Sequence, residues 1–348
     1  MSRLRMPRRL PVDPFVLALL GTVALAALLP ARGAAADLVG QAAGWAVGLL
    51  FFLYGARMSP REAADGVRHW RLHLTVLLCT FGLFPLLGLA VRALPSALLS
   101  PELATGVLFL CLLPSTVQSA IAFTSIARGN VAAAVCSGTF SNLLGILITP
   151  LLAGLLIGVS GGFSAGSLAD IALKLLAPFA VGQLLRRRIG GWITRHRRVT
   201  GLVDRGSILL VVYSAFGEGV VGGVWHRLTL PRLGMLLVVE AVLLAVVLTV
   251  TALGSRRLGF AREDRVAIVF CGSKKSLASG LPIASVLFAG PAAGLMVLPL
   301  MLFHQMQLMV CAVLARRWAA RTPVPSPDVP SPAGPAPAGL PAREGVVA

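Results

Sequence analysis

Long apolar stretches separated by short polar segments fill most of this chain. A helix needs about 20 consecutive, mainly apolar residues to cross the hydrocarbon core of a membrane. Stretches close to that length lie at residues 14–30, 39–57, 73–94, 103–128, 131–157, 169–185, 203–223, 233–254, 266–289 and 292–315. The pattern predicts an all-α polytopic membrane protein with ten transmembrane helices.

A strongly basic segment, 186–205, divides these stretches into two sets of five. Because five is odd, the second set enters the membrane in the opposite orientation, which is typical of an inverted-topology repeat. We therefore predict a basic cytoplasmic N-terminus at 1–13, a first repeat at 14–157 and a second repeat at 158–318. The Pro/Ala-rich segment 319–348 lacks apolar periodicity and is predicted to be a disordered cytoplasmic tail.

The charge of the chain follows the same topology. The sequence is 57% hydrophobic and 13% charged, with a net charge of +18. With both termini in the cytoplasm, the arginines left on the outer side are Arg32, Arg92, Arg227 and Arg232. This asymmetry is expected for a membrane protein, whose positive charge stays inside. Topology therefore explains the basic composition, and we expect a lipid bilayer rather than a nucleic acid as its partner.

Two adjacent lysines, Lys274 and Lys275, interrupt the apolar stretch 266–289 near its middle. A charged side chain at the centre of a bilayer costs about 2.5–3.5 kcal/mol on insertion scales, and such residues usually face a protein interior or a water-filled space. With Ser273 and Ser276 they form a polar break, which is typical of a discontinuous helix. We expect one lysine to face a cavity and the other a buried acidic or carbonyl partner.

A second break lies at the corresponding position of the first repeat. Pro114 removes a backbone donor from the stretch 103–128, and four polar residues follow it closely: Ser115, Thr116, Gln118 and Ser119. Interrupted segments at matching positions of two repeats indicate the binding site of a transporter. For either break alone, a tolerated kink or flexible turn is an equally good interpretation.

Further polar residues lie inside predicted helices. Serines and threonines often join membrane helices by hydrogen bonds, and a buried histidine is often structural. A structural role and a role in binding therefore both stay open for these residues. Glu240 is placed deep in its helix and could pair with a lysine. The candidate substrate- or ion-binding residues are Ser115, Thr116, Gln118, Ser119, Ser137, Thr139, Ser141, Asn142, Ser273, Lys274, Lys275, Ser276, His304 and Gln305.

Motifs of other protein classes are absent from the sequence. The five cysteines show no Cys-x-x-Cys spacing, and there is no Gly-rich phosphate loop and no nucleophile elbow. We therefore predict that the protein is not an enzyme and needs no cofactor apart from a coupling ion, Na⁺ or H⁺.

Three stretches resemble the bile acid:sodium symporter superfamily, and most closely the branch that contains sodium/bile-acid cotransporter 7 and its bacterial relatives. The first contains Tyr54-Gly-Ala-Arg-Met-Ser-Pro-Arg and His69-Trp-Arg-Leu-His-Leu. The second contains Pro114-Ser-Thr-Val-Gln-Ser-Ala-Ile-Ala-Phe-Thr and Asn142-Leu-Leu-Gly-Ile. The third contains Phe270-Cys-Gly-Ser-Lys-Lys-Ser-Leu and His304-Gln.

This resemblance implies ten helices in two inverted five-helix repeats, located in a bacterial inner membrane. The first, second, sixth and seventh helices would form a panel domain, and the others a core domain in which the broken fourth and ninth helices cross. The resemblance also implies sodium-coupled uptake of an organic anion, such as a bile acid or another steroid, by alternating access.

The residues depart from this family in the ninth helix. An acidic residue and a glutamine that help to hold sodium in the bile-acid branch are replaced here by Phe270 and Lys274 in our alignment. A lysine ammonium can take the place of a bound cation, so that we expect coupling to sodium or protons and leave the metal site open. The alternative function is a regulator of calcium or pH homeostasis without uptake. The substrate and the oligomeric state cannot be read from the sequence.

Overall fold

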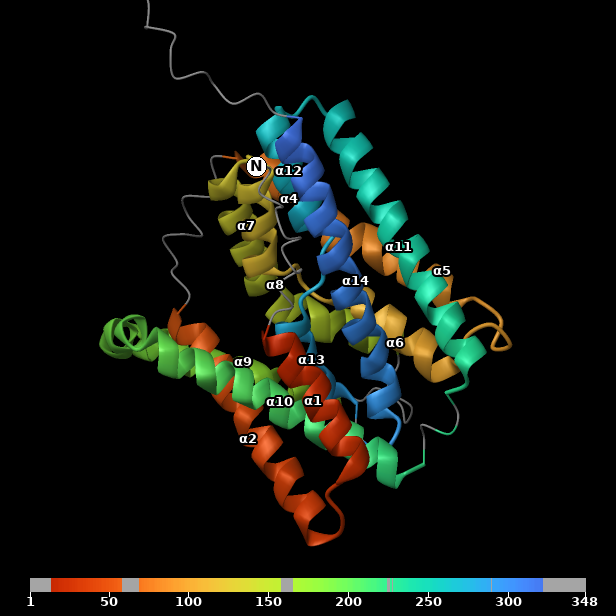
Figure 1. Cartoon of the computed structure of the whole chain (residues 1–348). Coiled ribbons are helices and arrows are strands. Elements are labelled where there is room, and N and C mark those ends of the chain that lie inside the picture. The colour runs from red at the N-terminus through yellow and green to blue at the C-terminus, as the bar shows by residue number, and fades with distance from the viewer. Residues whose placement is uncertain are drawn as a thin grey trace, which may run out of the picture.

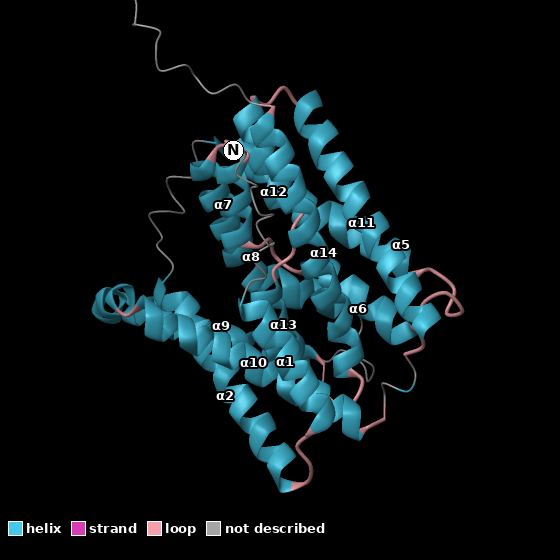
Figure 2. Cartoon of the chain, in the orientation of Figure 1, coloured by secondary structure: helices cyan, strands magenta, loops and turns pink. Residues whose placement is uncertain are grey.

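The structure is a computed structural model, and it describes residues 14–57, 69–157, 165–223, 226, 228–288 and 290–321. These residues form helices joined by short loops, with no strand among them (Figures 1 and 2). The predicted N-terminal segment 1–13 and the predicted tail beyond residue 321 lie outside the described residues. The predicted domain boundaries remain predictions.

The helices of the first half follow the predicted apolar stretches closely. They are α1 (Pro14–Leu28), α2 (Ala34–Arg57), α4 (Trp70–Leu78), the π-helical turn η2 (Cys79–Leu83), α5 (Phe84–Arg92), α6 (Pro101–Leu112), α7 (Val117–Ile126) and α8 (Val131–Ile157). α4, η2 and α5 run on without interruption and together form one long helix.

The second half contains α9 (Ala165–Arg195), α10 (Arg197–Val221), α11 (Leu230–Arg257), α12 (Arg262–Gly272), α13 (Leu277–Leu287) and α14 (Ala293–Ala320). Several of these helices extend beyond the predicted apolar limits into charged sequence. α12, for example, begins with Arg262 and Glu263, because a helix can continue into water once it has left the hydrocarbon.

Six helices in the described residues are long and apolar enough to cross a membrane, and the bent pair α6 and α7 adds a seventh. The chain is therefore an all-helical protein with several membrane spans, as predicted. Three of the ten predicted spans are not among these seven. α1 has only 15 residues, α12 opens with four consecutive charged residues, and α9 also falls outside the set.

Helices α1, α2, α9 and α10 pack together as one group (Figure 1). The approach of α2 to α9 is close because each contributes a glycine to the contact. A Cβ atom on Gly55 would lie 2.0 Å from the carbonyl oxygen of Phe179, and one on Gly182 would lie 2.1 Å from that of Phe52. Only residues without a side chain allow two helix backbones to come this near.

Replacing Gly182 by alanine is expected to destabilise the protein. The added methyl group would collide with the backbone of α2, and overpacking of this kind costs about 1–3 kcal/mol. Thermal unfolding of the purified protein in detergent measures the effect. Gly21→Ala is the matched control, because its Cβ would meet no atom within 4 Å and alanine favours a helix over glycine by about 1 kcal/mol. Equal melting temperatures of the two variants would contradict the proposed close packing.

Candidate functional site at the crossing of two interrupted helices

The first interruption separates α6 from α7. Pro114 has no N–H and cannot continue the hydrogen-bond ladder of α6, which ends at Leu112. α7 starts at Val117, and the two helices form an angle of 65°. The break predicted from the sequence is thus confirmed, and it lies over residues 113–116.

Helix α8 binds the backbone groups that this break exposes. Thr149 Oγ1 donates to the carbonyl of Leu112 at 2.8 Å, and Asn142 Nδ2 donates to that of Ser115 at 2.8 Å. Ser141 Oγ accepts from the N–H of Ser115 at 2.9 Å. These polar residues of α8 therefore replace the helical partners that Pro114 removes, as buried backbone groups require.

The second interruption separates α12 from α13 at residues 273–276, where the lysines predicted the break. Gln307 of α14 binds both backbone groups of Lys275. Its Oε1 accepts from the Lys275 N–H at 2.9 Å and its Nε2 donates to the Lys275 carbonyl at 2.9 Å. Nδ1 of His304 lies 2.9 Å from the same Nε2. The side-chain amide of Gln307 thus takes the place of the backbone groups that would pair with Lys275 in a continuous helix.

The two breaks bond directly to each other, and we call this junction the crossing. The N–H of Ser276 donates to the Pro114 carbonyl at 2.9 Å, and Ser115 Oγ donates to the Cys271 carbonyl at 2.5 Å. Thr116 Oγ1 donates to the Lys275 carbonyl at 2.7 Å. These hydrogen bonds therefore join segments more than 150 residues apart in the chain.

The ammonium group of Lys275 sits inside this crossing, with no exposed surface. It donates to three backbone carbonyls, those of Thr80, Cys111 and Leu113, at 2.8, 2.8 and 2.7 Å. The ring of Phe84 lies 4.1 Å from Nζ, measured to the ring centroid. All three donor positions of the ammonium are used, and the aromatic ring adds a cation–π contact.

The carbonyl of Thr80 is available to Lys275 because of the π-helical turn η2. In an α-helix this carbonyl would accept from the N–H of Phe84, but that N–H bonds to the carbonyl of Cys79. The next residue, Pro85, has no N–H. The turn therefore leaves a carbonyl without a partner in its own helix, and π-helical turns of this kind often occur at functional sites.

Lys274 has a different environment, although it too is completely buried. Its Nζ donates to Ser119 Oγ at 2.9 Å and lies 3.9 Å from the centroid of the Phe123 ring. Among the described residues, neither lysine forms an ion pair with a carboxylate. The expected carbonyl partner is thus found for Lys275, whereas Lys274 lines neither of the two cavities described below.

The remaining predicted residues fall into two groups. Ser273 and Ser276 bond within the second break, to Val269 and Ser279, and Ser137 Oγ lies 2.8 Å from Nδ1 of His73. Gln118 is exposed, and Thr139 and Gln305 are half-buried; none of these three has a hydrogen bond to the crossing within the described residues.

Sequence analysis missed Gln307 and Thr80 as site residues. Gln307 follows His304 by three positions, so the two residues share one face of the helix. This spacing could have favoured Gln307 over Gln305 as a site residue. Thr80 contributes only its backbone, and the signal there is Pro85, five residues later.

A cavity of about 700 Å³ lies between helices α2 and α10 on one side and helices α13 and α14 on the other. Its walls are mainly apolar or glycine. The polar lining residues are Gln41, Ser214, Glu218 and Ser285. Glu218 is the charged residue among them and accepts a hydrogen bond from Ser214 Oγ at 3.1 Å. The cavity therefore suits a mainly apolar small molecule with a few polar groups.

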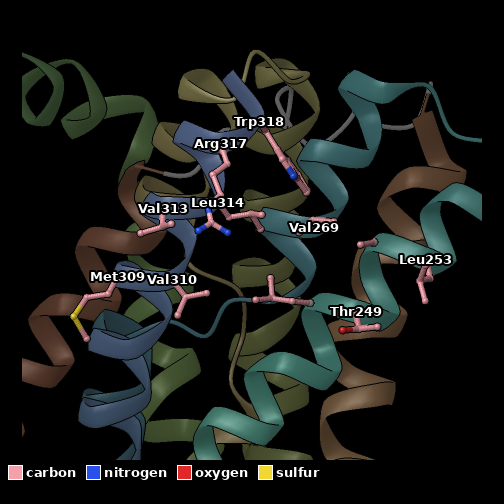
Figure 3. Close-up of a pocket in the computed structure, with 11 residues that line it drawn as sticks. Thr249, Leu253, Val269, Met309, Val310, Val313, Leu314, Arg317 and Trp318 are labelled. Carbon is pink, nitrogen blue, oxygen red and sulfur yellow. The ribbon is translucent and has the colours of Figure 1, made fainter. Parts of the chain in front are cut away.

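A second hollow, of about 630 Å³, lies between α11, α12 and α14 (Figure 3). Several of its apolar residues, including Leu253, Met309 and Val313, are at least half exposed. Large exposed apolar side chains on membrane helices face lipid, so we assign this hollow to the lipid surface and not to the functional site.

The described helices define a multi-span membrane protein. The chain matches the SBF-like CPA transporter family over residues 13–320, and it belongs to that family. The resemblance to bile acid:sodium symporters is thereby confirmed.

Three relatives illustrate the family. The chain is 56% identical to the uncharacterized protein PA2026 of Pseudomonas aeruginosa over 317 residues, covering 90% of this chain and 95% of that protein. It is 51% identical to the putative symporter YfeH of Escherichia coli over 312 residues, covering 89% and 94%. It is 29% identical to sodium/bile acid cotransporter 7 of Mus musculus over 276 residues, covering 77% and 80%.

Proposed function

We propose that this chain is a secondary active transporter that carries an organic anion across a bacterial inner membrane by alternating access, with both of its termini in the cytoplasm. The observation that carries the proposal is the junction of two interrupted helices, one of which, α13, also lines a cavity of about 700 Å³. Discontinuous helices near mid-membrane are the usual site of substrate and ion binding in secondary transporters.

The proposed architecture has ten spans in two inverted repeats. Counting α1, α9 and the broken pairs α6–α7 and α12–α13 as spans gives ten. The two repeats also use equivalent residues at their breaks. Asn142, on the last helix of the first half, donates to the Ser115 carbonyl, and Gln307, on the last helix of the second half, donates to the Lys275 carbonyl. This equivalence supports an internal repeat.

Movement of the α1–α2–α9–α10 group against the remaining helices would provide alternating access. The proposal is supported by the position of the cavity, whose lining comes from α2 and α10 on one side and from α13 and α14 on the other. The close glycine contacts between α2 and α9 would keep the moving group rigid.

The mainly apolar walls favour an amphipathic solute, and the names of the mammalian and amphibian relatives, sodium/bile acid cotransporter 7, suggest bile acids as the first compounds to test. Because the Glu218 carboxylate would repel an anionic group, we place that group on the opposite side of the cavity, near Ser285 of α13. Coupling to sodium at the crossing is disfavoured, since the Lys275 ammonium already fills the three-carbonyl cluster. Of the two coupling ions expected from the sequence, Na⁺ and H⁺, the proton therefore remains.

A ligand screen tests this function. Purified protein in detergent is heated with bile acids and other amphipathic anions, and in parallel with neutral and cationic amphiphiles of similar size, in sodium and in potassium buffers. Stabilisation by anions in both buffers, followed by uptake of the same compound into proteoliposomes, is expected. Stabilisation by cationic amphiphiles alone would contradict an anionic substrate.

Replacing Gly44 by leucine is expected to weaken binding of the compound found in this screen by roughly tenfold, or about 1.4 kcal/mol. Gly44 lines the cavity, and a Cβ there would meet no atom within 4 Å, so that the larger side chain narrows the cavity without disturbing the fold. Binding is measured by the ligand-dependent rise in melting temperature. Gly21→Leu, also without a neighbour within 4 Å but outside the cavity, should bind as the wild type does; equal weakening in both variants would place the binding site elsewhere.

A further inference from the structure

Glu240 of α11 is a completely buried carboxyl group to which no role has been assigned above. Its residue has no exposed surface, and it lies on the face of α11 that packs into the protein, together with Leu236, Leu243 and Leu244. It is the eleventh residue of the helix, so that it lies about 15 Å from the helix start at a rise of 1.5 Å per residue. This depth places the carboxyl group well inside the membrane.

Both carboxyl oxygens of Glu240 lack a hydrogen-bond partner among the described residues. The sequence suggested that this residue could pair with a lysine, but that suggestion is wrong: the lysines at the crossing bond to carbonyls and a hydroxyl group instead. An ionised carboxylate in such surroundings carries a very large desolvation cost without compensation. In this structure the carboxyl group is therefore neutral and holds a proton.

The groups around Glu240 offer it no permanent counter-charge. Helix α11 packs against η2, α5, α12 and α14. The titratable groups on those elements and on α6 are engaged elsewhere, buried as thiols, or near helix ends: Cys79, Arg92, Glu102, Cys111, Arg262, Glu263, Asp264, Arg265, Cys271, His304, Cys311, Arg316 and Arg317. Arg92, for example, donates to the carbonyls of Leu156 and Ile157.

Among the described residues, Cys111 of α6 is near enough to Glu240 for the two groups to interact electrostatically. The backbone carbonyl of Cys111 accepts a hydrogen bond from Lys275 Nζ at 2.8 Å. Cys111 thus lies between Glu240 and the crossing, so that a rearrangement of the crossing would alter the surroundings of the carboxyl group.

We propose that Glu240 is a proton-binding site that holds a proton in the present conformation and releases it when the crossing rearranges, so that H⁺ is the coupling ion of the transporter. The proton-binding site follows from the geometry of Glu240 alone, whereas its use in coupling rests on the proposed transport function. A permanently neutral acid would be an unsatisfied polar group in an apolar site, and carboxyl groups inside membrane spans commonly belong to proton pathways.

Infrared spectroscopy of the full-length protein in lipid tests the proton-binding site without a substrate. The carbonyl stretching band of a protonated carboxylic acid is expected in the wild type at neutral pH, and it should be lost reversibly in alkaline buffer. The band should be missing in Glu240→Gln, shifted in Glu240→Asp and retained in Glu218→Gln. A wild-type spectrum identical to that of Glu240→Gln, or a band that persists at every pH, would overturn the proposal.

A transport measurement tests the coupling. For a solute identified in the ligand screen, an imposed pH gradient should drive accumulation into proteoliposomes with the wild type, and Glu240→Gln should only equilibrate the solute. Accumulation driven equally well by both proteins would overturn the coupling role. If no solute is transported at all, the proposed function fails, while the infrared result still decides whether Glu240 binds a proton.

Discussion

Replacing Lys275 by methionine is expected to destabilise the protein by roughly 3 kcal/mol or more. The variant keeps most of the side-chain volume but removes the donor from the carbonyls of Thr80, Cys111 and Leu113. Each buried carbonyl left without a partner costs about 1–3 kcal/mol. The melting temperature and the yield of monodisperse protein in detergent measure the effect.

Lys274→Met is the matched comparison and is expected to be far less harmful. Lys274 donates to a single hydroxyl group, that of Ser119, which can rotate to another acceptor when the ammonium is removed. Replacing a buried charge by an apolar side chain of similar volume is often neutral or even stabilising. If Lys274→Met lowered stability as much as Lys275→Met, the carbonyl cluster would not be the reason for the sensitivity of position 275.

Replacing Gln307 by leucine is the second change with a large expected effect. The side-chain amide of Gln307 accepts from the N–H of Lys275 and donates to the Lys275 carbonyl, and it also contacts His304. Its loss leaves a buried N–H without a partner, while the Lys275 carbonyl keeps its bond to Thr116. We expect a loss of about 2–4 kcal/mol, because one orphaned group costs about 1–3 kcal/mol and further hydrogen bonds are lost with it.

Gln305→Leu is the control for this variant. Gln305 lies two residues away on the same helix, is half-buried and has no hydrogen bond to the crossing. The same chemical change should therefore be tolerated there, with a melting temperature close to that of the wild type. A stronger effect at position 305 than at position 307 would mean that the crossing is not held by the amide of α14.

Much of the architecture could be predicted from the sequence because the membrane imposes simple constraints on it. The apolar stretch 131–157 coincides with α8 at both ends, and the polar residues after Pro114 and around Lys274 correctly indicated two breaks. In each case a local pattern carries the information: an apolar run defines a helix, and a proline or a charged pair interrupts it.

The partners of Lys275 could not be predicted in this way. Lys275 bonds to carbonyls that lie more than 160 positions away in the sequence, and a carbonyl belongs to every residue type alike. The predicted candidates therefore contained the donor but none of its acceptors. The same limit explains why Gln305 was predicted as a site residue in place of Gln307. The two residues are of the same type, and their roles differ because they lie on different faces of the helix.

All acceptors of the Lys275 ammonium belong to the main chain, and this has a consequence for mutational tolerance. Substitutions of the side chains at positions 80, 111 and 113 leave those oxygens in place, provided that the local backbone is kept. The donor, by contrast, is a side chain, and a substitution of Lys275 removes it. Homologous chains should consequently vary in residue type at the three accepting positions and keep the donating lysine and the proline that follows the η2 turn.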